Sequence, residues 1–186
     1  MANIIGLVGF KQVGKSTAAK YLEEKYSFTR HNFKDALVQE IKDNFPDLLR
    51  ELSQAYHMDV DKLFQNKPIA MRALMQNYGT DVRRKDDDSY WVEKWMYSVL
   101  TSDNKNIVCD DVRFLNENGI LKDASQHSGV KGIIIRLTRS DITTGGEHVS
   151  ETEMLDIKAD YTIDCKEGEH DKLYKELDAI IKLQNE

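Results

Sequence analysis

The sequence predicts an α/β fold in which helices cover both faces of a parallel sheet. Three runs are mainly apolar and rich in β-branched residues, as buried parallel strands are, at 3–10, 106–112 and 130–138. Segments with apolar residues at helical spacing separate these runs, and such alternation is typical of strands joined by crossover helices. A glycine-rich stretch also joins the first strand directly to the first helix, where helix N–H groups are available to an anion.

The remaining elements follow in chain order. Apolar periodicity predicts helices at 16–26, 31–45, 48–56, 69–79, 89–101 and 170–184. The second of these ends near Pro46, since proline is excluded from a helix interior. A short strand is expected at 160–165, just before the last helix.

Length and composition are those of a globular protein. The chain has 186 residues, of which 40% are hydrophobic and 31% charged, and this is enough to build a core. It has no internal repeat and no linker-like segment, so we expect a single domain over 1–186. Within it we expect a helical insertion at about 34–100 and a polar, lid-like loop at about 138–152. Gly145 and Gly146 are the expected hinge of that loop.

Charge and cysteine usage exclude several classes of protein. A net charge of −6 weighs against a general nucleic-acid binder. Cys109 and Cys165 lie in apolar, strand-like runs without metal-ligand spacing, so we expect two buried free thiols in a reducing compartment. No segment has the length and apolarity of a membrane span, and the N-terminus lacks the charged region of a signal peptide. We therefore expect a cytoplasmic protein.

The stretch "GFKQVGKST" fits the pattern G-x-x-x-x-G-K-[ST]. Its glycines allow a tight turn in which successive N–H groups point inward at an anion. Lys15 is placed to neutralise the β- and γ-phosphates, and the Ser16 hydroxyl is a ligand for Mg²⁺. A chance glycine turn is disfavoured because a strand precedes the stretch and a helix follows it. The residues expected to bind the nucleotide are Gly9, Val13, Gly14, Lys15, Ser16 and Thr17.

A second cluster lies where a strand ends in "NIVCDDVRF". A carboxylate at the end of a neighbouring strand commonly anchors Mg²⁺ or its water ligands. Asp110 and Asp111 are both candidates, and strand alternation means that one of them faces the loop. Arg113 would face the same cleft, where its planar fork suits a phosphate. Without the phosphate loop, a surface salt bridge would be the preferred interpretation.

The segment 71–95 forms a third cluster, because it mixes arginines with aromatic residues. A flat base that carries a phosphate requires a stacking face and a guanidinium group. We expect Trp95 to be core and Trp91 to be shared between core and site, as tryptophans four apart on a helix usually pack inward. The other members are Arg72, Gln76, Arg83, Arg84 and Tyr90.

Four segments in this order, "GFKQVGKST", "LMQNYGTDVRR…YWV", "DDVRFLNE" and "HVSE", resemble the deoxynucleoside monophosphate kinases of bacteriophages and their relatives. These are small P-loop kinases of the adenylate-kinase-like type, and the resemblance runs from Gly6 to about Asp164. It implies a three-layer P-loop NTPase fold and transfer of the γ-phosphate of ATP to a deoxynucleoside monophosphate, with Mg²⁺ as cofactor. It also suggests a homodimer and, for a phage-encoded chain, the host cytoplasm, while the acidic charge argues against a nucleic-acid partner.

The resemblance assigns roles to individual residues. It implies that Arg113, Arg72 and Lys11 hold the phosphate of the monophosphate. It places the base against Trp91 with Gln76 nearby, so that the insertion binds substrate.

The resemblance also assigns roles to further arginines and to one glutamate of the sequence. Arg84 matches the arginine after the "GT" element, and Arg136 or Arg139 resembles a lid arginine that closes on the transferring group. Lys15, Arg113 and Arg139 are the expected catalytic residues. Glu151 of "HVSE" matches a family position near the base or sugar. Many members have Asp after the loop lysine, where this chain has Ser16, so their metal-site details do not transfer.

Three other readings compete with this one. A P-loop kinase of another small acceptor, such as dephospho-coenzyme A or a sugar acid, would keep the loop, carboxylate and arginines but would not need a base pocket. A GTPase switch would explain "TRSD" at 138–141, but the glycine of its D-x-x-G element is missing after "DDVRF". A nucleic-acid-binding ATPase would need a basic stripe that this acidic chain lacks.

Overall fold

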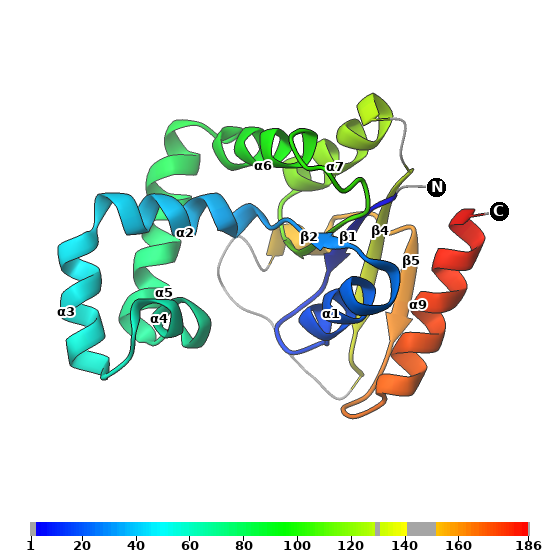
Figure 1. The fold of residues 1–186 in the computed structure, drawn as a ribbon, viewed down its shortest axis with the longest axis horizontal. Coiled ribbons are helices and arrows are strands. Elements are labelled where there is room, and N and C mark those ends of the chain that lie inside the picture. The colour runs from blue at the N-terminus through cyan, green and yellow to red at the C-terminus, as the bar shows by residue number, and fades with distance from the viewer. Residues whose placement is uncertain (1–2, 129–130, 141–151, 186) are drawn as a thin grey trace. The chain divides into compact units, whose positions relative to one another are not determined.

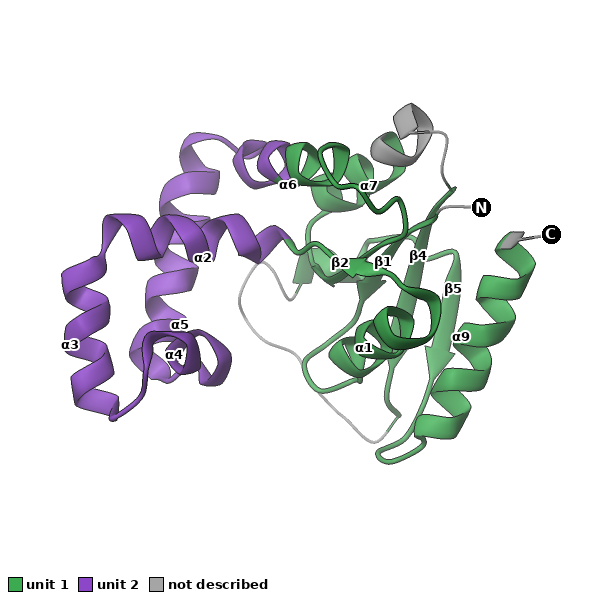
Figure 2. Cartoon of the chain, viewed as in Figure 1, with its two compact units in different colours: residues 1–32, 95–186 green, residues 33–94 purple. Residues whose placement is uncertain are grey.

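The computed structural model describes residues 3–128, 131–140 and 152–185 (Figure 1). The chain divides into two compact units (Figure 2). Unit 1 comprises Met1–Asn32 and Trp95–Glu186, and unit 2 comprises Phe33–Lys94. Unit 2 largely coincides with the segment 34–100 expected as a helical insertion, while its role in substrate binding stays a prediction.

Unit 1 is built on a five-stranded sheet in the order β2-β3-β1-β4-β5, in which every neighbouring pair is parallel. The central strand β1 is buried at every position, which explains its unbroken apolar sequence. The predicted parallel sheet is therefore confirmed. Its strands are β1 (Asn3–Val8), β2 (Thr29–Arg30), β3 (Ile107–Val112), β4 (Lys131–Thr138) and β5 (Tyr161–Asp164).

Helices cover both faces of this sheet, so unit 1 has three layers. α1 (Lys15–Tyr26) and α9 (His170–Asn185) lie on one face, where their apolar residues share a core with β1, β3 and β4 (Figure 1). α7 (Leu115–Ser128) packs on β1 and β4. Gly6 makes this packing close, because a Cβ there would lie 3.0 Å from Leu121 of α7.

Two elements of unit 1 differ from the sequence prediction. α7 was not expected, because its sequence "LNENGILKDASQHS" is largely polar and contains Gly119. β2 is only two residues long, too short to give a periodic signal. A short helix, η2 (Glu153–Leu155), also precedes β5.

Unit 2 is helical and has its own core. Pro46 occupies the first turn of α3, where its missing N–H costs nothing. α4 was not expected; Asp59 begins it by accepting a hydrogen bond of 2.8 Å from the backbone N–H of Lys62. The helices are α2 (Phe33–Asn44), α3 (Pro46–Tyr56), α4 (Val60–Asn66), α5 (Ile69–Gln76), the π-helix η1 (Asn77–Arg84) and the start of α6 (Tyr90–Leu100).

Three smaller expectations are settled by the packing. Cys109 and Cys165 are buried free thiols, as expected. Trp95 is 2% exposed and belongs to the core. Across the described ranges, every helix is too short or too polar to cross a lipid bilayer.

Candidate active site

The phosphate loop connects β1 to α1 through unusual backbone angles. Gly9 has φ +148° and Gly14 has φ +98°, and Gln12 between them has φ +63°. A Cβ on Gly9 would lie 2.3 Å from the carbonyl oxygen of Leu137 in β4. Gly9 is therefore required both for its backbone conformation and for the close approach of two strands.

The start of α1 is open to an anion. Gly14 is its N-cap and offers no side-chain hydrogen bond, and the first turn contains no acidic residue. The Lys15 ammonium donates to the carbonyl oxygens of Gly9 and Phe10, each at 2.6 Å, and is thereby held at the loop. Ser16 is exposed at the same helix start. This arrangement supplies N–H groups and a positive charge at one place.

The other members of the predicted nucleotide set divide between loop and core. Thr17 is half-buried in the first turn of α1, and Val13 is 5% exposed and packs in the core of unit 1. Val13 therefore contributes to the loop through its backbone and its packing. Lys11 is exposed, and its ammonium has no hydrogen bond or ion pair to any described residue.

Arg136 in β4 and Arg139 just after it contact different parts of the chain. Arg139 donates from Nη1 to the Gln12 carbonyl at 3.0 Å, so it lies against the phosphate loop. Arg136 donates from Nη2 to the carbonyls of Met154 and Ile157, at 3.1 Å and 2.6 Å. Burial lowers the pKa of Arg136. Of the two candidate lid arginines, Arg139 is at the loop and Arg136 anchors a neighbouring segment.

Asp110 lies in β3 on the side of α1. It is 4% exposed, and its Oδ2 lies 3.2 Å from Nη1 of Arg30. Arg30 also forms an ion pair with Glu23 of α1. Strand alternation puts Asp110 on the same face as Val108, which packs in the core beneath α1.

Asp111 points to the opposite face of β3. It is half-buried, and its Oδ1 accepts a hydrogen bond of 3.2 Å from the Cys109 thiol. Burial, reinforced by the Asp111 charge, raises the pKa of Cys109, so this thiol stays protonated and unreactive. The two aspartates therefore lie on opposite faces of β3, with Asp110 on the side of α1, and the assignment of a metal ligand between them stays a prediction.

Two carboxylates cap the turn that carries Arg113. Glu117 is 3% exposed, and its Oε2 accepts from the backbone N–H groups of Arg113 and Phe114 at 2.7 Å and 3.1 Å. Glu153 accepts from the N–H of Leu115 at 2.8 Å. Neither role was predicted from the sequence, although Glu117, three residues after Phe114 at the start of α7, stands at the usual capping position. These caps fix the backbone at Arg113, while its guanidinium group makes no hydrogen bond or ion pair with the described residues.

Unit 2 holds the other predicted substrate residues. Arg72 and Gln76 are four apart on α5, so they share one face of the helix. Arg72 is half-buried and Gln76 is exposed. The Arg72 guanidinium makes no hydrogen bond or ion pair with the rest of the described chain.

Arg84 and Trp91 are both buried, although a substrate site would need them to be accessible. Arg84 is 8% exposed, and its Nη1 lies 3.6 Å from Oδ1 of Asp88. Trp91 is 3% exposed and donates from Nε1 to the Gly79 carbonyl at 2.8 Å. The structure thus places Trp91 in the core of unit 2, and its contact with a base stays a prediction.

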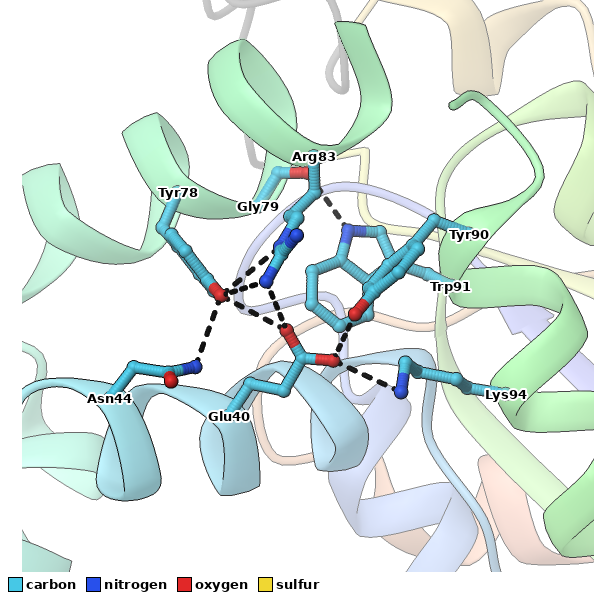
Figure 3. A network of polar contacts seen from close by, with 8 residues as sticks. All are labelled: Glu40, Asn44, Tyr78, Gly79, Arg83, Tyr90, Trp91 and Lys94. Carbon is cyan, nitrogen blue, oxygen red and sulfur yellow. Dashed lines mark hydrogen bonds and ion pairs between the residues drawn. The ribbon is translucent and has the colours of Figure 1, made fainter. Parts of the chain in front are cut away.

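Glu40 of α2 is the centre of a polar network that the sequence analysis did not single out (Figure 3). Its carboxylate meets the hydroxyls of Tyr78 and Tyr90 and the cations Arg83 and Lys94. Burial opposes ionisation of Glu40, but hydrogen bonds from Tyr90, Lys94 and Tyr78 outweigh it and lower its pKa. Glu40 is therefore a stable anion inside unit 2.

Some predicted residues lie outside the described part of the chain. These are Glu151, the Gly145–Gly146 pair and most of the expected lid-like loop 138–152. Their assignments stay predictions.

Comparison with known proteins adds to this geometry. No protein-family model matches the chain. A protein of Acanthamoeba polyphaga mimivirus, named "putative deoxynucleotide monophosphate kinase", is 29% identical over 172 residues, which cover 84% of each chain. The predicted resemblance to deoxynucleoside monophosphate kinases is thereby confirmed.

Solved structures bear on the fold. A crystal structure of a "putative kinase" from Chloroflexus aurantiacus aligns over 98% of this chain and 97% of its own, with a TM-score of 0.50 and 14% identity. The chain has the fold of a P-loop kinase. A shikimate kinase from Aquifex aeolicus aligns over 96% of both chains, with a TM-score of 0.47 and 14% identity. The predicted three-layer P-loop fold is confirmed by the first of these alignments.

Proposed function

We propose that this protein is an ATP-dependent deoxynucleoside monophosphate kinase, which converts a deoxynucleoside monophosphate and ATP to the diphosphate and ADP. One observation carries the proposal furthest. All of the arginines lie in the described part of the chain, and there the guanidinium groups of Arg72 and Arg113 alone make no hydrogen bond or ion pair. These are the two arginines assigned to the phosphate of the monophosphate. Both guanidinium groups are half-buried and available to an anion.

ATP is assigned to the phosphate loop. The N–H groups at the start of α1 and the Lys15 ammonium would hold and neutralise the β- and γ-phosphates. Arg139, which already contacts the Gln12 carbonyl, is close enough to the loop to support its conformation. Phosphoryl transfer requires mainly positioning and charge neutralisation, so no general base is assigned.

Mg²⁺ is the proposed cofactor, and the oxygen-bearing side chains at the start of α1 and at the end of β3 are of a kind that fits it. The Ser16 hydroxyl and a carboxylate of Asp110 or Asp111 are oxygen ligands of the kind that Mg²⁺ prefers. In the described part of the chain, no three His, Cys, Asp or Glu side chains cluster as a metal site. When bound, Mg²⁺ would neutralise charge on the β- and γ-phosphates.

The relative from the mimivirus supports the choice of acceptor, since its name specifies a deoxynucleotide monophosphate. A kinase of another small acceptor, such as dephospho-coenzyme A, is the second candidate. The burial of Trp91 favours this second candidate, because an indole in the core offers little surface on which a base could stack. A GTPase switch is the weaker alternative.

The test is an assay of ADP release from Mg²⁺-ATP with dAMP, dGMP, dTMP, dCMP, their ribonucleotides and dephospho-coenzyme A. We expect release with one or more deoxynucleotides. Lys15→Ala should abolish it, and Arg72→Ala and Arg113→Ala should each raise the acceptor KM by tenfold or more. Arg50→Ala is the matched control, because Arg50 is exposed and pairs only with Asp47 on its own helix.

The panel separates the candidates. Release with dephospho-coenzyme A alone would replace the acceptor named here. Tight GDP binding with no monophosphate-dependent release would support a GTPase instead. We also propose a homodimer that does not bind nucleic acid, to be checked by light scattering with and without DNA.

A further inference from the structure

Glu40 joins three elements of unit 2 through both oxygens of its carboxylate. Oε2 accepts from the Tyr78 hydroxyl at 3.0 Å and lies 3.3 Å from Nη2 of Arg83, both in η1. Oε1 accepts from the Tyr90 hydroxyl and lies 3.0 Å from Nζ of Lys94, both in α6. One anion on α2 thus holds η1 and α6 at the same time (Figure 3).

Arg83 is clamped between two aromatic rings. Its guanidinium carbon lies 5.1 Å from the centre of the Tyr78 ring and 5.0 Å from that of Tyr90. Nε and Nη2 of Arg83 also donate to the Tyr78 hydroxyl, at 3.0 Å and 2.7 Å. Cation–π contacts and charge-assisted hydrogen bonds therefore hold the same side chain.

The contact between Tyr78 and Arg83 depends on the kind of helix that joins them. These residues are five apart in η1, which is a π-helix. With i→i+5 hydrogen bonding, residues five apart return to the same side. In an α-helix, with 3.6 residues per turn, they would be separated by roughly 140° around the axis. The Arg83–Tyr78 pair can form only while this segment keeps its π-helical register.

The packing of Gly79 points the same way. A Cβ on Gly79 would lie 3.0 Å from Cδ2 of Leu37 on α2, so η1 passes close to α2. The Gly79 carbonyl accepts the Trp91 hydrogen bond from α6. Backbone and side-chain contacts thus bind η1 to the same two helices that Glu40 connects.

We propose that Glu40 is a positioning residue that holds the segment 77–84 in its π-helical register. Through that register, Glu40 sets the place of Arg84 relative to Arg72 and Gln76 on the preceding helix. The link to substrate rests on the proposed function, whereas the effect on the helix does not.

The first experiment measures amide hydrogen exchange on the full chain without ligand. In Glu40→Gln, one carboxylate oxygen becomes an NH₂ donor that faces Arg83 or Lys94, so the network opens. We expect amides in 77–84 to exchange about tenfold faster, while those of α3 keep their rates. Glu51→Gln on α3 is the matched control, because Glu51 is exposed. Unchanged exchange in 77–84, or equal acceleration throughout unit 2, would overturn the proposal.

A milder variant guards against a failure to fold. Tyr90→Phe keeps the ring beside Arg83 but removes one hydrogen bond to Glu40. We expect a smaller acceleration confined to the same amides. An effect in α3 as large as that in 77–84 would also contradict the proposal.

The second experiment compares kinetic constants in the same variants. Glu40→Gln should raise the acceptor KM about tenfold and leave the KM for ATP unchanged, which a general loss of stability would not do. A variant with faster exchange in 77–84 but an unchanged acceptor KM would overturn the link to substrate. If the parent chain phosphorylates no monophosphate, the proposed function fails, and the exchange experiment alone decides the role of Glu40.

Discussion

Arg139 donates a hydrogen bond of 3.0 Å to the carbonyl of Gln12, which ties the end of β4 to the phosphate loop. Gln12 has φ +63°, a conformation that is uncommon for residues other than glycine and has an energetic cost. Arg139 also lies 3.2 Å from Glu167, whose side chain is 85% exposed, whereas that of Arg139 is 13% exposed. Both contacts are solvent-exposed, but the contact with Gln12 is the one that reaches the phosphate loop.

From this relationship we predict that Arg139→Ala weakens ATP binding about tenfold, since a charge-assisted hydrogen bond to the strained phosphate loop is lost. Glu167→Ala should change binding less than twofold, as expected for an exposed ion pair. Titration with a fluorescent ATP analogue measures both. Equal losses in the two variants would show that the ion pair matters and the contact with Gln12 does not.

Gly9 and Gly119 give opposite predictions for the same substitution. Gly9→Ala places a Cβ 2.3 Å from the Leu137 carbonyl at φ +148°, so we expect about 2 kcal/mol or more of lost stability and no ATP binding. Gly119 lies in α7 with nothing within 4 Å of a Cβ, so Gly119→Ala should stabilise by about 0.5–1 kcal/mol. Urea unfolding followed by circular dichroism measures both changes. A tolerated Gly9→Ala would contradict the loop geometry.

Glu117 caps the turn at Arg113, and its removal should affect both stability and acceptor binding. Glu117→Ala leaves two backbone N–H groups without their acceptor, which we expect to cost about 1–2 kcal/mol. The acceptor KM should also rise, because the backbone of Arg113 loses its support. Glu176→Ala on an exposed face of α9 is the control. Loss of stability without a change in acceptor KM would separate the cap from the site.

Much of unit 1 could be predicted from local sequence. β1 is buried throughout and the central positions of β3 and β4 are buried, so these strands are mainly apolar, and the phosphate loop is defined by nearby glycines, Lys15 and Ser16. These features depend on neighbours in the chain. α7 was missed because its sequence is largely polar and contains Gly119.

The features that could not be predicted depend on contacts between distant residues. The π-helix at 77–84 is joined to Glu40, which lies on another helix, and no local pattern distinguishes it from an α-helix. The sequence predicted an aromatic and cationic cluster at 71–95, but it did not show that Trp91 is buried in the core. Nor did it show that Asp110 pairs with Arg30, because strand order brings these residues together.

The last prediction concerns pH. Burial works against the Glu40 carboxylate, but donors from η1 (Tyr78 and Arg83) and from α6 (Tyr90 and Lys94) face it and lower its pKa below the ordinary value of 4.5. A group with a lowered pKa in the folded state stabilises the fold above its unfolded pKa, and this contribution is lost as pH falls through the folded pKa.

The melting temperature of the parent chain should therefore fall more steeply between pH 6 and acidic pH, through and below about 4.5, than that of Glu40→Gln. The two should differ most near neutral pH and converge in acid. Differential scanning calorimetry over this range measures the difference, and Glu51→Gln should follow the parent at every pH. A constant gap between the parent and Glu40→Gln would mean that Glu40 acts through its shape and not through its charge.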